Sequence, residues 1–235
     1  MSSPAVYRSP RPTATVSTVL LAVAGAATLA SLGTGFRLYL EAGELADDVE
    51  ADGSALTDAA QLYEGVGLLQ VVALAASAIA FLVWFYRVRV NAEVFDPHGH
   101  RFRRGWAIGG WFTPVVALWF PRQIAGDIWQ ATARPDASGI RMRLPQTLLT
   151  LWWITFWLSN AADRFGNHYL GTSAAQYADG YQEAVGWLLI ADLLSVVASV
   201  FAVLVVQRLT AMQEERFTES ATPVFGGVHG GTVWS

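Results

Sequence analysis

The chain has 235 residues, of which 53% are hydrophobic and only 14% are charged. Because a soluble domain carries about a quarter charged residues, this composition is typical of a membrane protein. The chain contains neither cysteine nor lysine, which excludes disulfides, thiolate metal sites and Schiff-base chemistry. The net charge of −4 and the scattered arginines do not favour binding to nucleic acid, so we expect no such partner.

Four apolar segments are long enough to cross a bilayer as helices, which requires roughly 20 residues for a hydrocarbon core of about 30 Å. They cover residues 16–40, 62–86, 145–162 and 184–206. The sequence therefore predicts an all-α integral membrane four-helix bundle, built as a single transmembrane domain over residues 16–217. The first segment also resembles a cleaved signal peptide, but its long apolar stretch favours a retained anchor. The flanking segments 1–15 and 218–235 are predicted to be disordered tails.

A fifth apolar run, Trp106–Phe120, has only fifteen residues and is broken by Pro114. Arginines lie on both sides of it, at positions 87, 89, 101, 103, 104, 122, 134, 141 and 143. Because cytoplasmic flanks accumulate arginine, both sides of the run are predicted to be cytoplasmic. Residues 106–131 are therefore expected to form a re-entrant or interfacial, proline-broken helical segment on that side, with an amphipathic helix after Pro121. A fifth crossing through residues 106–121 is the alternative.

Small residues at a spacing of four predict where the spans pack closely, because helices in lipid associate through close backbone approach. These residues are Ala22, Ala26 and Ala30 on the first span, Ala76 and Ala80 on the second, and Ala191, Ser195 and Ser199 on the fourth. Indole rings favour the membrane interface. We therefore expect an aromatic belt at the inner interface that consists of Trp84, Trp106, Trp111, Trp119 and Trp129.

Asp192 is an ionisable residue deep inside a predicted span. A carboxylate at that depth costs roughly 2.5–3.5 kcal/mol on insertion scales, so it should face the protein interior and have a partner or a role. Counting along the spans puts Gln70, Thr155 and either Ser31 or Thr34 at a similar depth, and Ser195 on the same helix face. This predicted polar site is either a hydrogen-bond network that fixes helix register or a proton- or cation-responsive site.

The inner segment carries a distinctive pattern of aromatic, proline and glycine residues. Its motif residues are Trp84, Arg87, Asn91, Trp106, Gly109, Trp111, Phe112, Pro114, Pro121 and Trp129. They form a Trp-x-x-Arg-x-x-x-Asn stretch and a Gly-Trp-x-x-Gly-x-Trp-Phe-x-Pro stretch. Over roughly residues 62–206 this arrangement resembles the actinobacterial multi-pass membrane proteins of the family domain of unknown function 4328. The resemblance implies a helical membrane fold with a proline-broken inner segment, and it implies no activity, substrate or catalytic residue.

No set of acid, base and nucleophile converges in the sequence, and no phosphate-binding or zinc-protease motif occurs, so an enzyme is not expected. Asp96, His98 and His100 are interpreted as a solvated turn, and we predict neither metal nor cofactor. The leading hypothesis is an accessory or scaffold subunit of a bacterial plasma membrane, with both termini cytoplasmic. Its expected contacts are the lipid bilayer and either a membrane protein partner or further copies of itself. The alternative is a small transporter or channel that uses Asp192.

Overall fold

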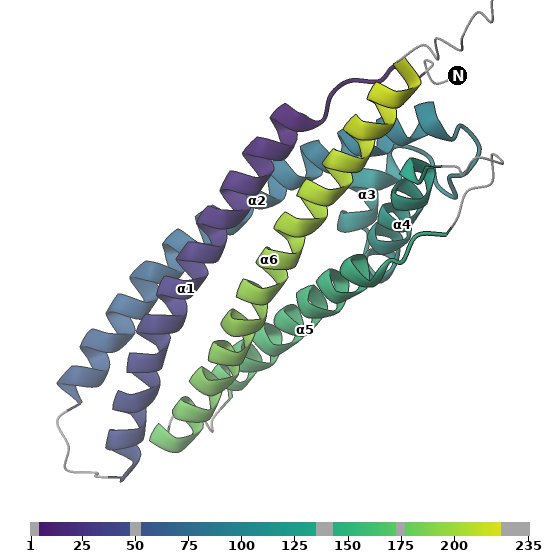
Figure 1. The fold of residues 1–235 in the computed structure, drawn as a ribbon. Helices are drawn as coiled ribbons and strands as arrows, with labels where there is room; N and C mark the ends of the chain where they lie inside the picture. Colours follow the sequence, from purple (N-terminus) through teal and green to yellow (C-terminus); the bar gives the residue numbers. More distant parts are fainter. Residues whose placement is uncertain (1–4, 48–52, 135–142, 173–176, 222–235) are drawn as a thin grey trace, which may run out of the picture.

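The structure, a computed structural model, describes residues 5–47, 53–134, 143–172 and 177–221. Within these ranges the chain is all-α, as predicted. The helices are α1 (Arg11–Asp47), α2 (Ser54–Phe95), α3 (Trp106–Phe112), the 3₁₀ turn η1 (Val116–Leu118), α4 (Phe120–Thr132), α5 (Thr147–Leu170) and α6 (Ala178–Ala221). Figure 1 shows that α1, α2, α5 and α6 are long and that α3 and α4 form a short hairpin at one end.

Proline sets several of the helix boundaries. Helix α1 begins directly after Pro10, whose carbonyl accepts the first helical hydrogen bond. Helix α2 ends at Phe95 because Pro97 disfavours helical geometry in the residue before it. Pro114 ends α3 in the same way, and Pro121 lies in the first turn of α4, where its missing N–H has no cost.

Three of the described helices, α1, α2 and α6, are long and apolar enough to cross a membrane. The sequence predicted a fourth span at residues 145–162, and the structure has a helix there, α5. Its apolar stretch ends after Leu158, because Ser159, Asn160, Asp163 and Arg164 follow within the same helix. By composition alone, α5 is therefore a weaker membrane-spanning candidate than the other three.

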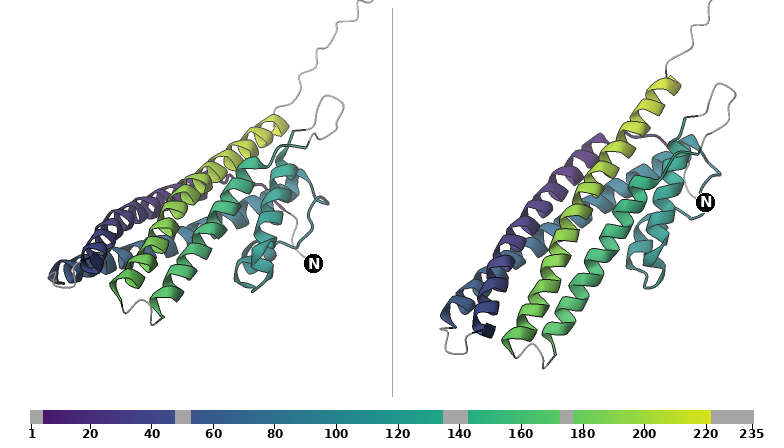
Figure 2. Two further views of the ribbon diagram at one scale, coloured as in Figure 1. Left: turned by 90° about the horizontal axis from the view of Figure 1, so that it is seen from below. Right: turned by 60° about the horizontal axis from the view of Figure 1, so that its bottom comes forward.

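The long helices lie in a row in the order α2, α1, α6, α5, each antiparallel to its neighbour (Figure 2). The backbones of the edge helices α2 and α5 do not approach each other within the described residues. At one end the α3–α4 hairpin fills the space between them, contacting α2, α5 and α6. This open row differs from the compact bundle that the sequence predicted, because the hairpin occupies the place where the edge helices would meet.

The two ends of the row differ in packing. One end, which we call the terminus end, holds residues 5–10 and the last turns of α6, and most of the buried core lies there. That core includes Trp84, Phe85, Ile128, Val206 and Leu209. At the opposite, far end, where α1 ends and α6 begins, a smaller cluster surrounds Leu38, Ala59 and Val185. The rigid packing is therefore concentrated around the hairpin.

Several predicted faces and boundaries are wrong. Ala22, Ala26 and Ala30 all lie on the exposed side of α1, and its packed face instead contains Ser17, Ala24, Gly25, Thr28 and Ser31. Gly25 allows the close approach of α6, because a Cβ there would lie 2.9 Å from Ser199 Oγ. Both faces of α1 are rich in small residues, so spacing alone could not distinguish them.

The predicted tails and the predicted amphipathic helix also need correction. Residues 5–10 pack against α2 and α6 and α1 already begins at Arg11, while α6 continues to Ala221. The rest of the predicted tails, residues 1–4 and 222–235, lies outside the described residues. Helix α4 does present Ile124 and Ile128 to the core, but most of its other residues are buried too. Most of its surface is thus enclosed by protein, so its residues do not divide into one buried and one exposed face.

Candidate functional site

Asp192 lies inside the apolar part of α6 and is 8% exposed. Its Oδ1 accepts a hydrogen bond of 2.8 Å from Gln70 Nε2 of α2. The same nitrogen donates to Thr28 Oγ1 of α1 at 3.3 Å. One amide therefore links three neighbouring helices, and we call Asp192, Gln70 and Thr28 the polar layer.

The polar layer is incompletely hydrogen-bonded. Asp192 Oδ2 is buried and has no hydrogen-bond partner among the described residues, and the same holds for the hydroxyl of Ser31 on α1. Tyr63 of α2 lies within electrostatic range of the carboxylate. Because nearly all buried polar atoms in proteins are paired, the free oxygen of this carboxylate, with the hydroxyl of Ser31 beside it, distinguishes the polar layer from an ordinary hydrogen-bond network.

The structure brings Gln70 to Asp192, but it does not hydrogen-bond the other two predicted members to them. Thr155 donates to the carbonyls of Leu151 and Trp152 within its own helix, α5. Ser195 is half-buried and forms no hydrogen bond within the described residues. Thr28 was missed, and its only signal was its position one turn from Ser31, which the depth count did include.

A second network holds the N-terminal segment at the terminus end. The buried amide of Asn91 on α2 donates to the carbonyl of Arg8 at 2.8 Å and accepts from the N–H of Arg8 at 3.1 Å. It also donates to Gln213 Oε1 of α6, whose own amide donates to the carbonyl of Val88. Asn91 therefore pairs with residue 8 as a neighbouring backbone would, and we call this arrangement the Asn91 clamp.

Two of the five predicted belt tryptophans are core residues. Trp84 is fully buried and donates to Thr210 Oγ1 of α6 at 3.0 Å. Trp129 on α4 is 6% exposed. Only Trp106 and Trp119 are substantially exposed, and Trp111 is half-buried. The belt prediction fails at Trp84 and Trp129 because both side chains belong to the buried core that α2, the hairpin, α5 and α6 share.

Trp111 joins the hairpin to both edge helices. Its ring lies 5.8 Å from that of Phe81 on α2 and 5.9 Å from that of Trp153 on α5, measured between centroids. The indole N–H of Trp153 donates to the carbonyl of Leu118 at 3.1 Å, which fixes the tip of the hairpin against α5. The aromatic motif residues therefore position the hairpin.

The outer side of the hairpin is apolar and uncovered. Val115, at its tip, is 66% exposed and has a φ of 67°, an unusual value for a β-branched residue. The N–H of Val116 bonds to the carbonyl of Pro114 at 2.8 Å, so Val115 is the centre of a tight three-residue turn. Further exposed apolar side chains on the same segment are Trp106, Ile108, Phe112, Leu118 and Trp119. We call this surface the hairpin tip.

Charged residues connect α2 to the hairpin. Arg89 is almost fully buried; it donates to Glu93 Oε1 at 2.8 Å and to the carbonyl of Phe102 at 2.7 Å. Arg104 donates to the other Glu93 oxygen, and Arg101 pairs with Asp127 of α4 at 3.1 Å. Arginines that the sequence marked only as cytoplasmic charges therefore also form ion pairs that hold the hairpin.

His100 is the shielded member of the Asp96–His100 turn. His98 is exposed, whereas both ring nitrogens of His100 are buried. Burial and the nearby Arg89 lower the pKa of His100, because both disfavour the charged ring. The solvated-turn interpretation therefore fits His98 but not His100.

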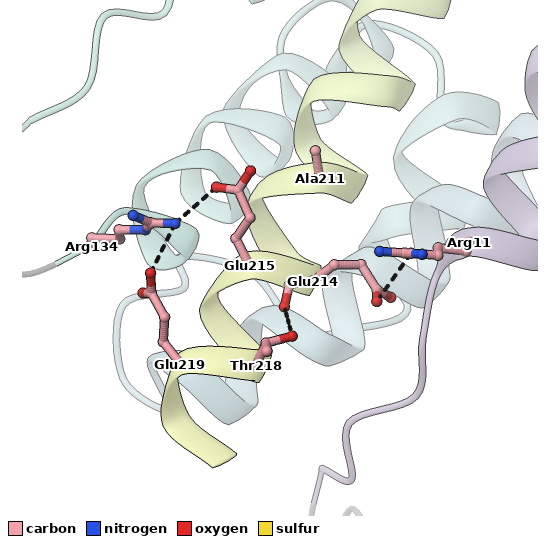
Figure 3. Close-up of a pocket in the computed structure, with 7 residues that line it drawn as sticks. All are labelled: Arg11, Arg134, Ala211, Glu214, Glu215, Thr218 and Glu219. Atoms are coloured by element: carbon pink, nitrogen blue, oxygen red, sulfur yellow. Dashed lines mark hydrogen bonds and ion pairs between the residues drawn. The ribbon is translucent and has the colours of Figure 1, made fainter. Parts of the chain in front are cut away.

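A pocket of about 360 Å³ lies where the ends of α1, α4 and α6 meet, and Figure 3 shows the residues that line it. Arg134 pairs with both Glu215 and Glu219, at 2.9 and 3.0 Å, and Arg11 pairs with Glu214 at 3.2 Å. Every arginine lining this pocket is thus paired with a carboxylate. Its ion pairs fasten the termini together. No group of residues in the described ranges has a composition that could hold a metal ion.

Comparison with curated proteins and with solved structures finds no match. A protein-family model does match, over residues 47–211, and it is described as domain of unknown function 4328. The match includes α2, the hairpin, α5 and most of α6, and therefore all the motif residues from Trp84 to Trp129. Because the matched segment is well over half of the chain, the protein belongs to the family domain of unknown function 4328.

Proposed function

We propose that the protein is a non-enzymatic accessory or scaffold subunit of a bacterial plasma membrane, crossing it four times with both termini in the cytoplasm. One observation carries the proposal: the apolar hairpin tip is exposed, although the rest of the hairpin is fixed by aromatic contacts and ion pairs. A rigid support beneath an uncovered apolar surface suits contact with lipid or with another membrane protein.

The packing of α5 supports the fourth crossing. Helix α5 starts beside the hairpin at the terminus end and runs antiparallel along α6 (Figure 1). Gly166 lets the two helices approach closely near the far end, because a Cβ there would lie 2.9 Å from Leu188 Cδ2. If α6 crosses the bilayer, its neighbour α5 passes through the same depth. The four crossings would then form an open bundle.

The distribution of arginine supports the orientation. Among the described arginines, only Arg37 and Arg164 lie toward the far end of the helix row. The others lie around the terminus end, which the positive-inside rule makes cytoplasmic. The hairpin leaves from and returns to that end, so residues 106–131 would re-enter the membrane from the cytoplasm without crossing it.

Single cysteines test this topology, because the native chain has none. Asp58→Cys, His98→Cys and His168→Cys replace exposed residues and can be labelled in intact cells with an impermeant maleimide. We expect Asp58→Cys and His168→Cys to be labelled and His98→Cys to be protected. Protection of His168→Cys together with labelling of Asp58→Cys would mean that α5 does not cross.

The hairpin tip is tested by purification from native membranes. Phe112→Ser removes an apolar side chain that is 72% exposed, and Leu69→Ser removes one that is 68% exposed on α2, far from the hairpin. We expect a partner protein at stoichiometric amount with the wild type and with Leu69→Ser, and its loss with Phe112→Ser. Equal recovery with both variants, or no stoichiometric partner with the wild type, would refute the accessory role.

A second function, a proton- or cation-responsive transporter or channel, is favoured by the unpaired Oδ2 of Asp192. Asp192→Asn preserves the shape of the side chain and removes its charge, and Asp163→Asn makes the same change at an exposed position on α5. If the carboxylate serves transport, vesicles with Asp192→Asn should lose pH-dependent ion flux while the purified protein keeps its melting temperature. Unchanged flux with an altered melting temperature would assign Asp192 a structural role.

A further inference from the structure

A groove of about 440 Å³ runs between α1 and α2 toward the terminus end. Its lining is almost entirely apolar, with Pro12, Val16 and Leu20 on one side and Ala76, Ala80 and Val83 on the other. The two alanines leave the space, because longer side chains at their positions would fill it. Val16 and Val83 are each 54% exposed, so the groove opens to the outside of the helix row.

An unpaired arginine stands at the terminus end of this groove. Ala76, Ala80, Val83 and Arg87 follow one another at spacings of four, three and four, which places them on one face of α2. Arg87 is half-buried and forms no hydrogen bond or ion pair with the described residues. Its guanidinium is therefore available to an anion just beyond the apolar lining.

A second free arginine is held close by. Asn91 lies one turn beyond Arg87, and the Asn91 clamp fixes the backbone of Arg8 there through two hydrogen bonds. The side chain of Arg8 is exposed and has no ion pair among the described residues, whereas Arg11 is engaged by Glu214. The chain thus brings two uncommitted positive charges to the same end of the groove.

We propose that this groove binds one anionic phospholipid, with an acyl chain between α1 and α2 and the phosphate on Arg87, assisted by Arg8. The groove and Arg87 lie at the depths where a lipid has its acyl chain and its phosphate. The groove lies within apolar stretches of two candidate membrane spans, and Arg87 lies where the apolar stretch of α2 ends. Basic residues at the ends of membrane helices are well suited to lipid phosphates. An apolar partner helix would fill the groove but leave both guanidiniums unpaired.

The test measures retained lipid by native mass spectrometry. The full-length protein is placed in nanodiscs of equimolar phosphatidylglycerol and phosphatidylcholine and then released in detergent. Arg87→Gln removes the proposed phosphate ligand. Arg103→Gln is its matched control, an exposed arginine with no ion pair among the described residues at the same end of the molecule. Ala80→Phe fills the groove, and Val71→Phe places the same ring on the opposite, exposed face of α2.

The wild type should retain phosphatidylglycerol in preference to phosphatidylcholine. Arg87→Gln should lower that preference about fivefold, the factor for one basic residue near an anionic leaflet, and Arg87→Lys should restore most of it. Ala80→Phe should lower retention of both lipids, and the two controls should match the wild type. Equal effects of Arg87→Gln and Arg103→Gln would overturn the site. The proposal would also be overturned if Ala80→Phe converted a dimer to a monomer and left lipid retention unchanged. A second copy of the chain would then be the occupant of the groove. The proposal requires only that α1 and α2 cross the bilayer, so it is independent of the accessory role.

Discussion

Replacing Asn91 with alanine should release the N-terminal segment from the helix row. The substitution removes three hydrogen bonds, two to the backbone of Arg8 and one to Gln213. Of these three, only the two bonds to Arg8 hold the segment, so at a net value of about 1 kcal/mol each, docking of residues 5–10 should weaken by about 2 kcal/mol. The released N–H and carbonyl of Arg8 regain hydrogen bonds to water. The substitution should therefore weaken the docking of this segment more than it lowers the free energy of unfolding of the rest of the protein.

A loss of about 2 kcal/mol raises the population of the undocked segment by roughly thirtyfold, since each 1.4 kcal/mol is a factor of ten. Trypsin cuts only after the backbone opens, and its rate follows the open population when opening is fast. We therefore expect cleavage after Arg8 in Asn91→Ala to accelerate by about that factor, measured by mass spectrometry of the N-terminal peptides in detergent.

Two variants make this result specific to the Asn91 clamp. Asn167→Ala removes an exposed asparagine that hydrogen-bonds only to Asp163 within α5, so N-terminal cleavage should match the wild type. Gln213→Met keeps the side-chain length and removes the hydrogen bonds of Gln213 to Asn91 and Val88, but it leaves both bonds between Asn91 and Arg8. It should therefore lower the melting temperature with little effect on N-terminal cleavage. Wild-type cleavage rates in Asn91→Ala would refute the docking of the segment.

Two further predictions concern stability. Gly166→Ala should destabilise the protein by about 1–3 kcal/mol, because the new Cβ would lie 2.9 Å from Leu188 Cδ2. A Cβ at Gly67 meets no atom within 4 Å, so Gly67→Ala should stabilise the protein by up to about 1 kcal/mol. Equal changes of the melting temperature in Gly166→Ala and Gly67→Ala would contradict the close approach of α5 and α6. The lowered pKa of His100 means that the unfolded chain binds its proton at higher pH than the folded one, so stability should fall as pH drops from about 7.5 to 5.5. His100→Gln should flatten this dependence of the melting temperature on pH, and His98→Gln should not. Parallel curves for the two variants would refute the claim that burial lowers the pKa of His100.

The sequence predicted the features that depend on local composition. Long apolar runs identified the helices, and prolines marked the boundaries of α3 and α4. The carboxylate of Asp192 identified its own helix face, and counting from the outer ends put Gln70 at the same depth. These inferences need only helix geometry and the cost of burying charge, so a single sequence contains them.

The features that the sequence did not predict depend on which helices are neighbours. Thr155 was placed with Asp192 on the assumption of a closed bundle, but in the open row the backbone of α5 lies along α6 and not along α2, and Thr155 hydrogen-bonds within its own helix. Gln213 pairs with Asn91 across 122 residues of chain, and no spacing rule connects them. Similarly, Trp84 and Trp129 match an interfacial belt by depth, and only the position of the hairpin reveals that both are enclosed.

The order of the helix row separates two regions of polar contact. The polar layer links α1, α2 and α6 at mid-span through Gln70, and it has no hydrogen bond to α5 among the described residues. The networks of the terminus end link α2, α4 and α6 through Asn91, Arg101 and Arg216. The polar layer joins α1, α2 and α6, which are neighbours in the helix row. A change of charge at Asp192 would therefore act first on the spacing of these three helices. The hairpin tip is attached through α5 and through the ion pairs on α2, so such a change would reach it either by way of α2 or by way of α6 and then α5.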